Sequence, residues 1–146
     1  MAGASIFAWV LTANQITEKF AALMLGISNN KIVILLIINV ILLVVGCFME
    51  TIAAITILTP VFLPVVMKFG IDPIHFGVVM VLNLMIGLLT PPVGMVLFVL
   101  ARVAKVPFER CAKATFPFLI PLIFVLLLIT FVEPLCMWLP NILFAK

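Results

Sequence analysis

The sequence is poor in charged residues. Asp, Glu, Lys and Arg together make up 9% of its 146 residues, whereas soluble domains contain about a quarter. Hydrophobic residues make up 67%, and the mean hydropathy is +1.51. A buried core with a polar surface cannot be built from this mixture, so the composition excludes a soluble domain and indicates an integral membrane protein. Eight basic residues against five acidic ones are too sparse for a nucleic-acid interface.

Cysteine and histidine are also scarce. The three cysteines, at 47, 111 and 136, form no CxxC pair, and His75 is the single histidine. This set provides neither a metal site nor a disulfide framework, and we interpret the cysteines as small apolar residues. The sequence has no Gly-rich phosphate loop, no HExxH motif and no serine beside a histidine. It therefore predicts a protein that is not an enzyme.

The first 30 residues predict two short elements. Residues 1–14 are apolar, but a spanning helix needs about 20 such residues, and no Lys or Arg precedes them as in a signal peptide. We expect a partial transmembrane helix there. In 15–30, apolar side chains recur on one helical face from Ile16 to Ile27. This pattern predicts an interfacial helix that lies along the membrane surface.

Residues 31–69 hold two uncharged runs separated by Glu50. One interpretation is two ordinary spanning helices with Glu50 in a turn at the surface. The other is a re-entrant helical hairpin whose tip, 46–51, lies partway through the bilayer. A first helix ending at Val45 would rise only about 21 Å in a hydrocarbon core about 30 Å thick. Pro60 and Pro64 weaken the second arm as a lipid-facing span, which favours the hairpin.

Residues 70–104 predict a transmembrane helix that is broken inside the bilayer. Asp72 and Pro73 form a favourable helix start, and helix is expected as far as Leu88. The following Thr-Pro-Pro-Val-Gly run, 90–94, lacks two amide donors and opposes helical geometry before each proline. Irregular backbone at this depth persists only where it is buried in protein or lines a wet cavity. A simple proline kink is the alternative.

Basic residues concentrate after this broken helix. They are Arg102, Lys105, Arg110 and Lys113, against the single acidic Glu109. Such a cluster is typical of the cytoplasmic side. We expect a cytoplasmic basic loop at 105–115, followed by a C-terminal transmembrane helix and tail at 116–146. Lys31, Lys68 and the C-terminus then lie on the outer side.

The two predicted interruptions are the strongest candidates for a binding site. A broken helix presents free carbonyl groups that bind a cation and free amides that bind an anion. Glu50 is the single acidic residue of the apolar interior, where an ionisable group is costly unless it has a partner. The expected cation-binding residues are Gly46, Glu50, Thr51, Thr90 and Gly94. Asn39 and Asn83 could join them, but such asparagines more often bridge helices.

Two segments closely resemble the C-terminal repeat of the large membrane subunit of TRAP transporters. They are GCFMETIAAITILTPVFLP at 46–64 and GIDPIHFGVVMVLNLMIGLLTPPVG at 70–94, and the resemblance extends over essentially the whole chain. TRAP transporters are tripartite, ATP-independent, ion-coupled uptake systems for organic acids. The resemblance implies an all-α integral membrane protein, the C-terminal half of an inverted-repeat elevator transporter. It favours the re-entrant hairpin at 31–69 and the broken helix at 70–104.

The resemblance also implies a sodium symporter. Residues 46–51 would be the outer hairpin tip and 90–94 the unwound loop, and together they would form one sodium site with the substrate alongside. Sodium would be the coupling ion, with no cofactor. The expected substrate-binding residues are Thr51, Pro91, Pro92 and Val93. Residues 15–30 would match an arm-like helix between scaffold and transport domain.

The partners that the resemblance implies are a small TRAP membrane subunit and a periplasmic solute-binding protein. The latter would deliver an organic acid of the C4-dicarboxylate or sialic acid class. The chain would cross the bacterial inner membrane several times. Because family members are much longer, it looks like a C-terminal fragment that lacks the N-terminal half of the large subunit. The alternative is a truncated or split-gene membrane remnant without transport activity of its own. An intramembrane enzyme has no nucleophile–base pair to support it.

Overall fold

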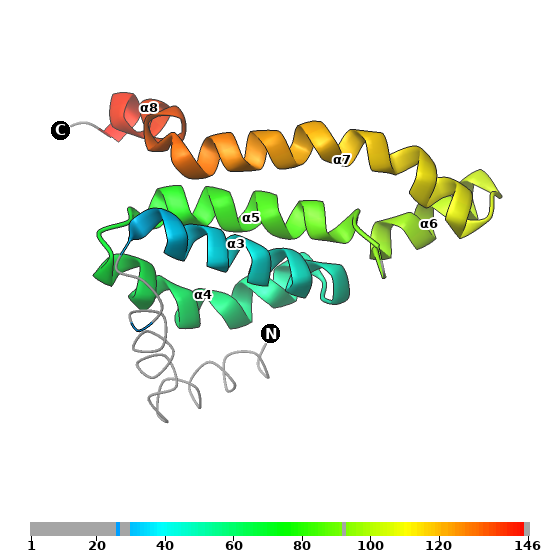
Figure 1. Ribbon diagram of the computed structural model, residues 1–146, viewed down its shortest axis with the longest axis horizontal. Helices are drawn as coiled ribbons and strands as arrows, with labels where there is room; N and C mark the ends of the chain where they lie inside the picture. The colour runs from blue at the N-terminus through cyan, green and yellow to red at the C-terminus, as the bar shows by residue number, and fades with distance from the viewer. Residues whose placement is uncertain (1–25, 27–29, 92, 145–146) are drawn as a thin grey trace.

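The computed structural model describes residues 26, 30–91 and 93–144, and every regular element in this part of the chain is an α-helix. The helices are α3 (Lys31–Phe48), α4 (Thr51–Lys68), α5 (Pro73–Leu88), α6 (Met95–Ala104), α7 (Phe108–Phe131) and α8 (Glu133–Phe144). In Figure 1, α3, α4, α5 and α7 run along the same long axis, and α6 continues beyond the end of α5. The partial helix expected at 1–14 and nearly all of the interfacial helix expected at 15–30 lie outside the described residues.

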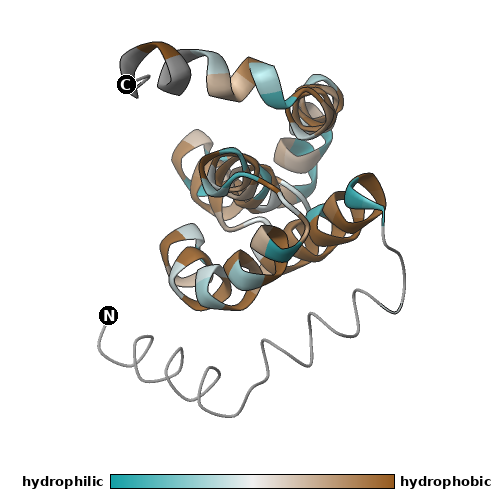
Figure 2. Cartoon of the chain, turned by 90° about the vertical axis from the view of Figure 1, so that its left-hand side faces the viewer, coloured by the Kyte–Doolittle hydropathy of each residue, from teal (hydrophilic) through white to brown (hydrophobic). Residues whose placement is uncertain are grey.

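Within the described part of the chain, three helices are long and apolar enough to cross a membrane, namely α3, α4 and α7. Large apolar side chains are exposed on all six helices from α3 to α8, and Figure 2 shows that hydrophobic residues predominate along the described helices. Soluble monomers rarely expose so much continuous apolar surface. This surface therefore agrees with the membrane protein that the composition predicts.

The connection between α3 and α4 is narrower than the tip predicted at 46–51. Only Met49 and Glu50 lie between the helices, because the Met49 amide still donates to the Val45 carbonyl (2.9 Å) and Glu50 is already the N-cap of α4. Gly46 and Thr51 therefore belong to helices. Each helix has 18 residues, which is a rise of about 27 Å and close to the hydrocarbon thickness. The re-entrant position of the hairpin stays a prediction.

Helix α4 is continuous although Pro60 and Pro64 lie within it. The prolines were expected to weaken this arm as a regular lipid-facing span, which the continuity of the helix does not test. Each proline removes only one amide donor. The hydrogen bonds of the neighbouring turns keep the chain helical on both sides of it. The two prolines therefore do not interrupt the helix.

Helix α5 is the central helix of the bundle. Asp72 accepts a hydrogen bond from the Ile74 amide (2.7 Å) and Pro73 occupies the first turn, so the predicted helix start is confirmed. The helix packs against α3, α4 and α7, and also contacts α6 and α8. The main core consists of side chains at four-residue spacing on α3 and α5, together with α4 residues, including Ile34, Ile38, Leu42, Phe62, Val65, Val66, Phe76, Met80 and Leu84. A second cluster joins α5 to α7 through Val79, Ile86, Leu119 and Leu126.

The basic loop expected at 105–115 is wrong in its extent. Only residues 105–107 separate α6 from α7, and the last helix begins at Phe108 rather than 116. Lys105 ends α6 in the left-handed conformation (φ 53°), and Pro107 then sits at the N-cap of α7. The basic segment after Pro107 is rich in Ala, Arg and Lys, which favour helix. The expected tail is helical too, because α8 occupies Glu133–Phe144.

The two ends of the helical bundle group the same segments that the sequence predicts on the same side of the membrane. The Lys31 ammonium lies 2.8 Å from the Glu133 carboxylate, which joins the start of α3 to the start of α8. Figure 1 shows the connection between α6 and α7 at the opposite end. Lys31 and the chain after α7 therefore share one end, and the basic segment lies at the other.

The candidate site at the hairpin tip and the helix break

The end of α3 and the end of α5 touch through their backbones. A Cβ atom built on Gly87 would lie 2.7 Å from the Cα and carbonyl carbon of Gly46. A Cβ built on Gly46 would lie 3.1 Å from the Cα and carbonyl oxygen of Leu84. Only glycine permits so close an approach of two helices. The predicted tip and the predicted break are therefore neighbours in space.

The break itself is a true interruption and not a kink. Helix α5 ends at Leu88 and α6 begins at Met95. The last turn of α5 is closed by the amides of Leu89 and Thr90, which donate to the carbonyls of Ile86 (3.0 Å) and Gly87 (2.9 Å). Two helix ends therefore meet at this point instead of one bent helix passing through it.

The carbonyl groups of Leu88, Leu89 and Thr90 receive no hydrogen bond from any described residue. The physical reason is local, since Pro91 and the residue after it have no amide hydrogen to donate. The Thr90 carbonyl oxygen lies beside Gly94, where a built Cβ would be 3.3 Å away. The Thr90 hydroxyl donates to the Ile86 carbonyl (2.8 Å), which leaves its oxygen lone pairs free. These oxygens can coordinate a cation.

The start of α6 has the opposite polarity. Gly94 is its N-cap, adopts a left-handed conformation (φ 53°) and supplies no side-chain cap. The first amides of α6 therefore have no partner within the helix, and an anionic group would bind there favourably. Pro91 is exposed and Val93 is half-buried next to this helix start. Pro92, also expected at the substrate, lies outside the described residues.

Glu50 was expected in the apolar interior, but the structure places it at the exposed connection between α3 and α4. Its side chain is exposed, and its two carboxylate oxygens accept hydrogen bonds from the amides of Ile52 (3.0 Å) and Ala53 (3.1 Å). The amides at the start of α4 are therefore occupied by the chain itself. Each carboxylate oxygen keeps a lone pair. Glu50 can cap α4 and face a cation at the same time.

Thr51 carries a buried hydroxyl group at the tip. Only 8% of the residue is exposed, and Oγ1 has no hydrogen bond with any residue that the structure describes. An unpaired buried hydroxyl costs about 1–3 kcal/mol, so such a group calls for an explanation. An ion or a substrate oxygen at the tip would supply the missing partner.

Asn39 and Asn83 form a buried polar bridge between helices, which is the alternative that the sequence left open. The Asn83 amide donates to the Asn39 side-chain oxygen (2.7 Å) and to its carbonyl (3.1 Å). The Asn39 amide donates to the Thr130 hydroxyl (3.0 Å), which joins α3 and α5 to α7. His75 is fully buried, and its Nε2 donates to the Ile129 carbonyl (2.8 Å).

Sequence reasoning missed Thr130 and Gly87. Thr130 is one of several threonines in apolar helices, so nothing in the sequence distinguishes it. Gly87 carried a weak signal, because a glycine inside a helical pattern often marks close packing. The partners of both residues lie far away along the chain.

The asparagine bridge leads to a prediction on stability. Asn83→Ala should lower the free energy of unfolding by about 0.6–2 kcal/mol, because Asn39 then loses its cross-helix donor. Thr115→Val is the matched control, since within the described residues the Thr115 hydroxyl bonds only the Cys111 carbonyl of its own helix (3.0 Å). Denaturant titration in detergent micelles measures both variants. Equal stability of the two would contradict the assigned role of the bridge.

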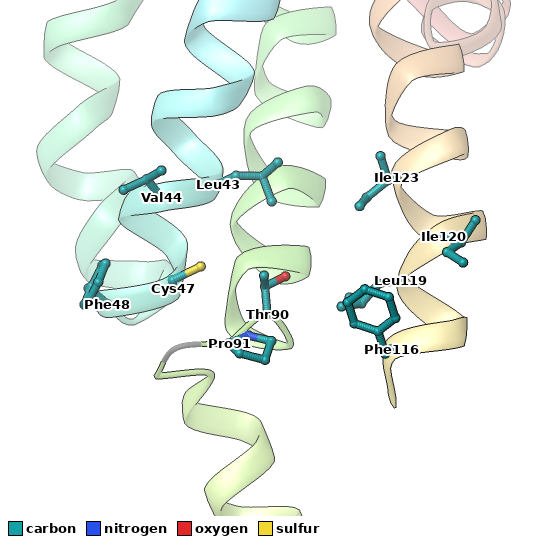
Figure 3. A pocket seen from close by; sticks show the side chains of 10 residues that line it. All are labelled: Leu43, Val44, Cys47, Phe48, Thr90, Pro91, Phe116, Leu119, Ile120 and Ile123. Carbon is teal, nitrogen blue, oxygen red and sulfur yellow. The ribbon is translucent and has the colours of Figure 1, made fainter. Parts of the chain in front are cut away.

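An apolar groove of about 480 Å³ lies beside the break, between the end of α3 and α7. Its lining residues are Leu43, Val44, Cys47, Phe48, Thr90, Pro91, Phe116, Leu119, Ile120 and Ile123. Figure 3 shows Phe116 and Leu119 reaching from α7 toward Thr90 and Pro91. No carboxylate or basic side chain lines the groove, so it suits an apolar ligand. Among the described residues no cluster of His, Cys, Asp and Glu could hold a metal.

Comparison with known proteins gives one consistent result. Residues 1–135 match the family described as "Tripartite ATP-independent periplasmic transporter, DctM component". The isethionate TRAP transporter permease protein DctMQ of Oleidesulfovibrio alaskensis is 47% identical over 138 residues, which are 94% of this chain and 22% of that protein. The sialic acid TRAP transporter large permease protein SiaM of Vibrio cholerae is 42% identical over 140 residues, or 96% of this chain and 33% of that protein.

A third relative, the C4-dicarboxylate TRAP transporter large permease protein DctM of Pseudomonas aeruginosa, is 42% identical over 141 residues. These cover 97% of this chain and 33% of that protein. The chain thus spans a third or less of the length of these relatives. All three are transport proteins and not enzymes.

Proposed function

Because this chain belongs to the family of the DctM component of tripartite ATP-independent periplasmic transporters, we propose that it forms the ion- and substrate-binding part of a sodium-coupled large permease subunit. The observation that carries the proposal is the contact between Gly46 and Gly87. Because this contact brings the end of α3 next to the end of α5, it supports a ligand site to which groups from the tip and the break both contribute. Paired helix interruptions of this kind hold the ligands of many secondary transporters.

The cation would be held by oxygen atoms on both sides of this contact. The free carbonyls of Leu88–Thr90 and the hydroxyl of Thr90 come from the break. The unpaired hydroxyl of Thr51 and the carboxylate of Glu50 come from the tip. Sodium is bound in such transporters by unwound carbonyls and helix C-terminal ends. Gly46 and Gly94 have a different role, since both lack a side chain where the backbone must approach closely.

The substrate would lie beside the cation, with its acidic group at the start of α6. That helix start has no side-chain cap, and its dipole favours an anion. Isethionate, sialic acid and C4-dicarboxylates, named for the relatives, all carry a sulfonate or carboxylate group. Thr51, Pro91, Pro92 and Val93 are the residues that we assign to the substrate side. The substrate class is therefore a small organic acid.

The transporter would need more than this chain. A small membrane subunit and a periplasmic solute-binding protein complete the assembly that we propose, together with the rest of a large subunit, since the relatives are about three times as long. The chain would cross the inner membrane several times, with the basic segment 102–113 on the cytoplasmic side.

The test is uptake of labelled organic acids by cells that carry the complete transporter, with and without sodium. Thr90→Val and Thr51→Val should each raise the sodium concentration for half-maximal uptake about tenfold, which corresponds to ~1.4 kcal/mol of lost cation binding. Thr90→Ser keeps the hydroxyl and should restore most of the affinity. The amount of subunit in the membrane should not change.

Thr115→Val is again the matched control, because its hydroxyl lies on α7 and bonds only its own helix. An unchanged sodium dependence in both threonine variants would remove the cation site from the tip and the break. Uptake that requires no sodium at all would reject sodium coupling. Absence of uptake by the complete assembly would reject the transport function.

A further inference from the structure

The groove beside the break continues toward a basic side chain. A second hollow of about 340 Å³ shares Pro91 and Phe116 with the groove and is lined in addition by Ala112 and Lys113. The two hollows together form a path that is apolar along α3 and α7 and ends at an ammonium group. We propose that this path binds an anionic phospholipid, with an acyl chain in the groove and the phosphate at Lys113.

One face of α7 carries this pattern. Lys113, Phe116, Ile120 and Ile123 follow one another at spacings of three, four and three residues, so they lie along a single stripe of the helix. The stripe changes from cationic to apolar along its length. A lipid has the same order of groups, from the charged phosphate at the membrane surface to the acyl chain in the interior.

Lys113 is available for a phosphate. Its side chain is exposed, and the only ion pair within the described part of the chain joins Lys31 to Glu133 at the other end of the bundle. Arg110 lies one turn before Lys113 on α7 and is also exposed. A lysine whose stem lies along apolar surface extends its ammonium toward the headgroup region. Basic pockets between transmembrane helices bind anionic headgroups.

The groove favours an acyl chain over the transported anion. Its walls are aliphatic and aromatic, and its Thr90 hydroxyl already donates to the Ile86 carbonyl. A carboxylate placed there would lose its hydration without gaining a partner. An acyl chain would instead cover exposed apolar surface of Phe48 on α3 and of Phe116 and Ile120 on α7.

Fluorescence quenching in vesicles tests the site. The full 146-residue chain is reconstituted in phosphatidylcholine vesicles, with Trp9→Phe, Trp138→Phe and Phe116→Trp, so that the only tryptophan lies in the groove. Brominated phosphatidylglycerol should quench this tryptophan with about fivefold higher apparent affinity than brominated phosphatidylcholine. Lys113→Gln should abolish the preference, and Lys113→Arg should keep it.

Two controls separate a site from general attraction to the basic end of the protein. Lys105→Gln removes the same charge from the turn between α6 and α7 and should keep the preference. Phe118→Trp, in place of Phe116→Trp, puts the probe on an exposed position of α7 outside the groove and should show no preference. Circular dichroism confirms that each variant is equally helical.

Three results would overturn the proposal. Equal quenching of the groove tryptophan by both lipids would identify ordinary boundary lipid. A preference that Lys113→Gln leaves unchanged would remove the headgroup contact. No quenching at all would mean that protein covers the groove.

Discussion

Gly87→Ala should destabilise the protein by about 1–3 kcal/mol, because its methyl group cannot be accommodated without moving α3. The added carbon would lie 2.7 Å from the Gly46 backbone, and a backbone cannot rotate away as a side chain can. Relief of the clash separates the hairpin tip from the break. In the complete transporter we therefore also expect uptake to fall at least about tenfold, as for a small misplacement of binding groups.

Two other glycines give a graded control for Gly87. Gly46→Ala meets backbone atoms at 3.1 Å, and so it should cost less than Gly87→Ala. Gly77→Ala lies on the same helix as Gly87 but meets nothing within 4 Å, so it should stabilise the helix by up to about 1 kcal/mol. Denaturant titration in detergent gives the three stabilities, and uptake is normalised to the amount of subunit in the membrane. Equal effects of the Gly87 and Gly77 substitutions would refute the close helix contact.

Glu50→Ala should also have a large effect, and Glu50→Gln separates its two roles. Alanine leaves the Ile52 and Ala53 amides without their acceptors, and loss of an N-cap costs about 0.5–2 kcal/mol. Glutamine keeps one acceptor oxygen but removes the negative charge. We expect Glu50→Gln to retain most of the stability and to raise the half-maximal sodium concentration for uptake about tenfold.

Stability and sodium-dependent uptake are measured on both Glu50 variants. A Glu50→Gln variant with normal sodium dependence would leave Glu50 as the cap of α4 alone and take it out of the cation site. A Glu50→Ala variant that is as stable as the unmodified chain would reject the capping role. Asp72→Ala is the matched control, since Asp72 caps α5 in a similar way at the other end of the bundle.

Local chemistry made several features predictable from the sequence. The composition indicated a membrane protein, Asp72 and Pro73 gave the start of α5, and the run 90–94 gave its interruption. Each depends on neighbours within one or two turns. The limits of the tip and of α7 were predicted less well. The tip was expected to be longer because glutamate is not among the preferred N-cap residues, yet Glu50 caps α4. The start of α7 was expected later because the charged segment after Pro107 resembled a loop, yet Pro107 is the N-cap of α7.

The sequence by itself determined that this protein belongs in a membrane, that its chain is interrupted after α5, and which family it belongs to. Only the tertiary structure decided that Gly46 lies against Gly87, that Asn39 bridges to Asn83 and Thr130, and that the groove at the break leads to Lys113. The physical reason is that lipid-facing and buried helix surfaces are both apolar. Hydrophobic periodicity, which identifies the packed face of a soluble helix, has little contrast here, and the partner of each face must be found in three dimensions.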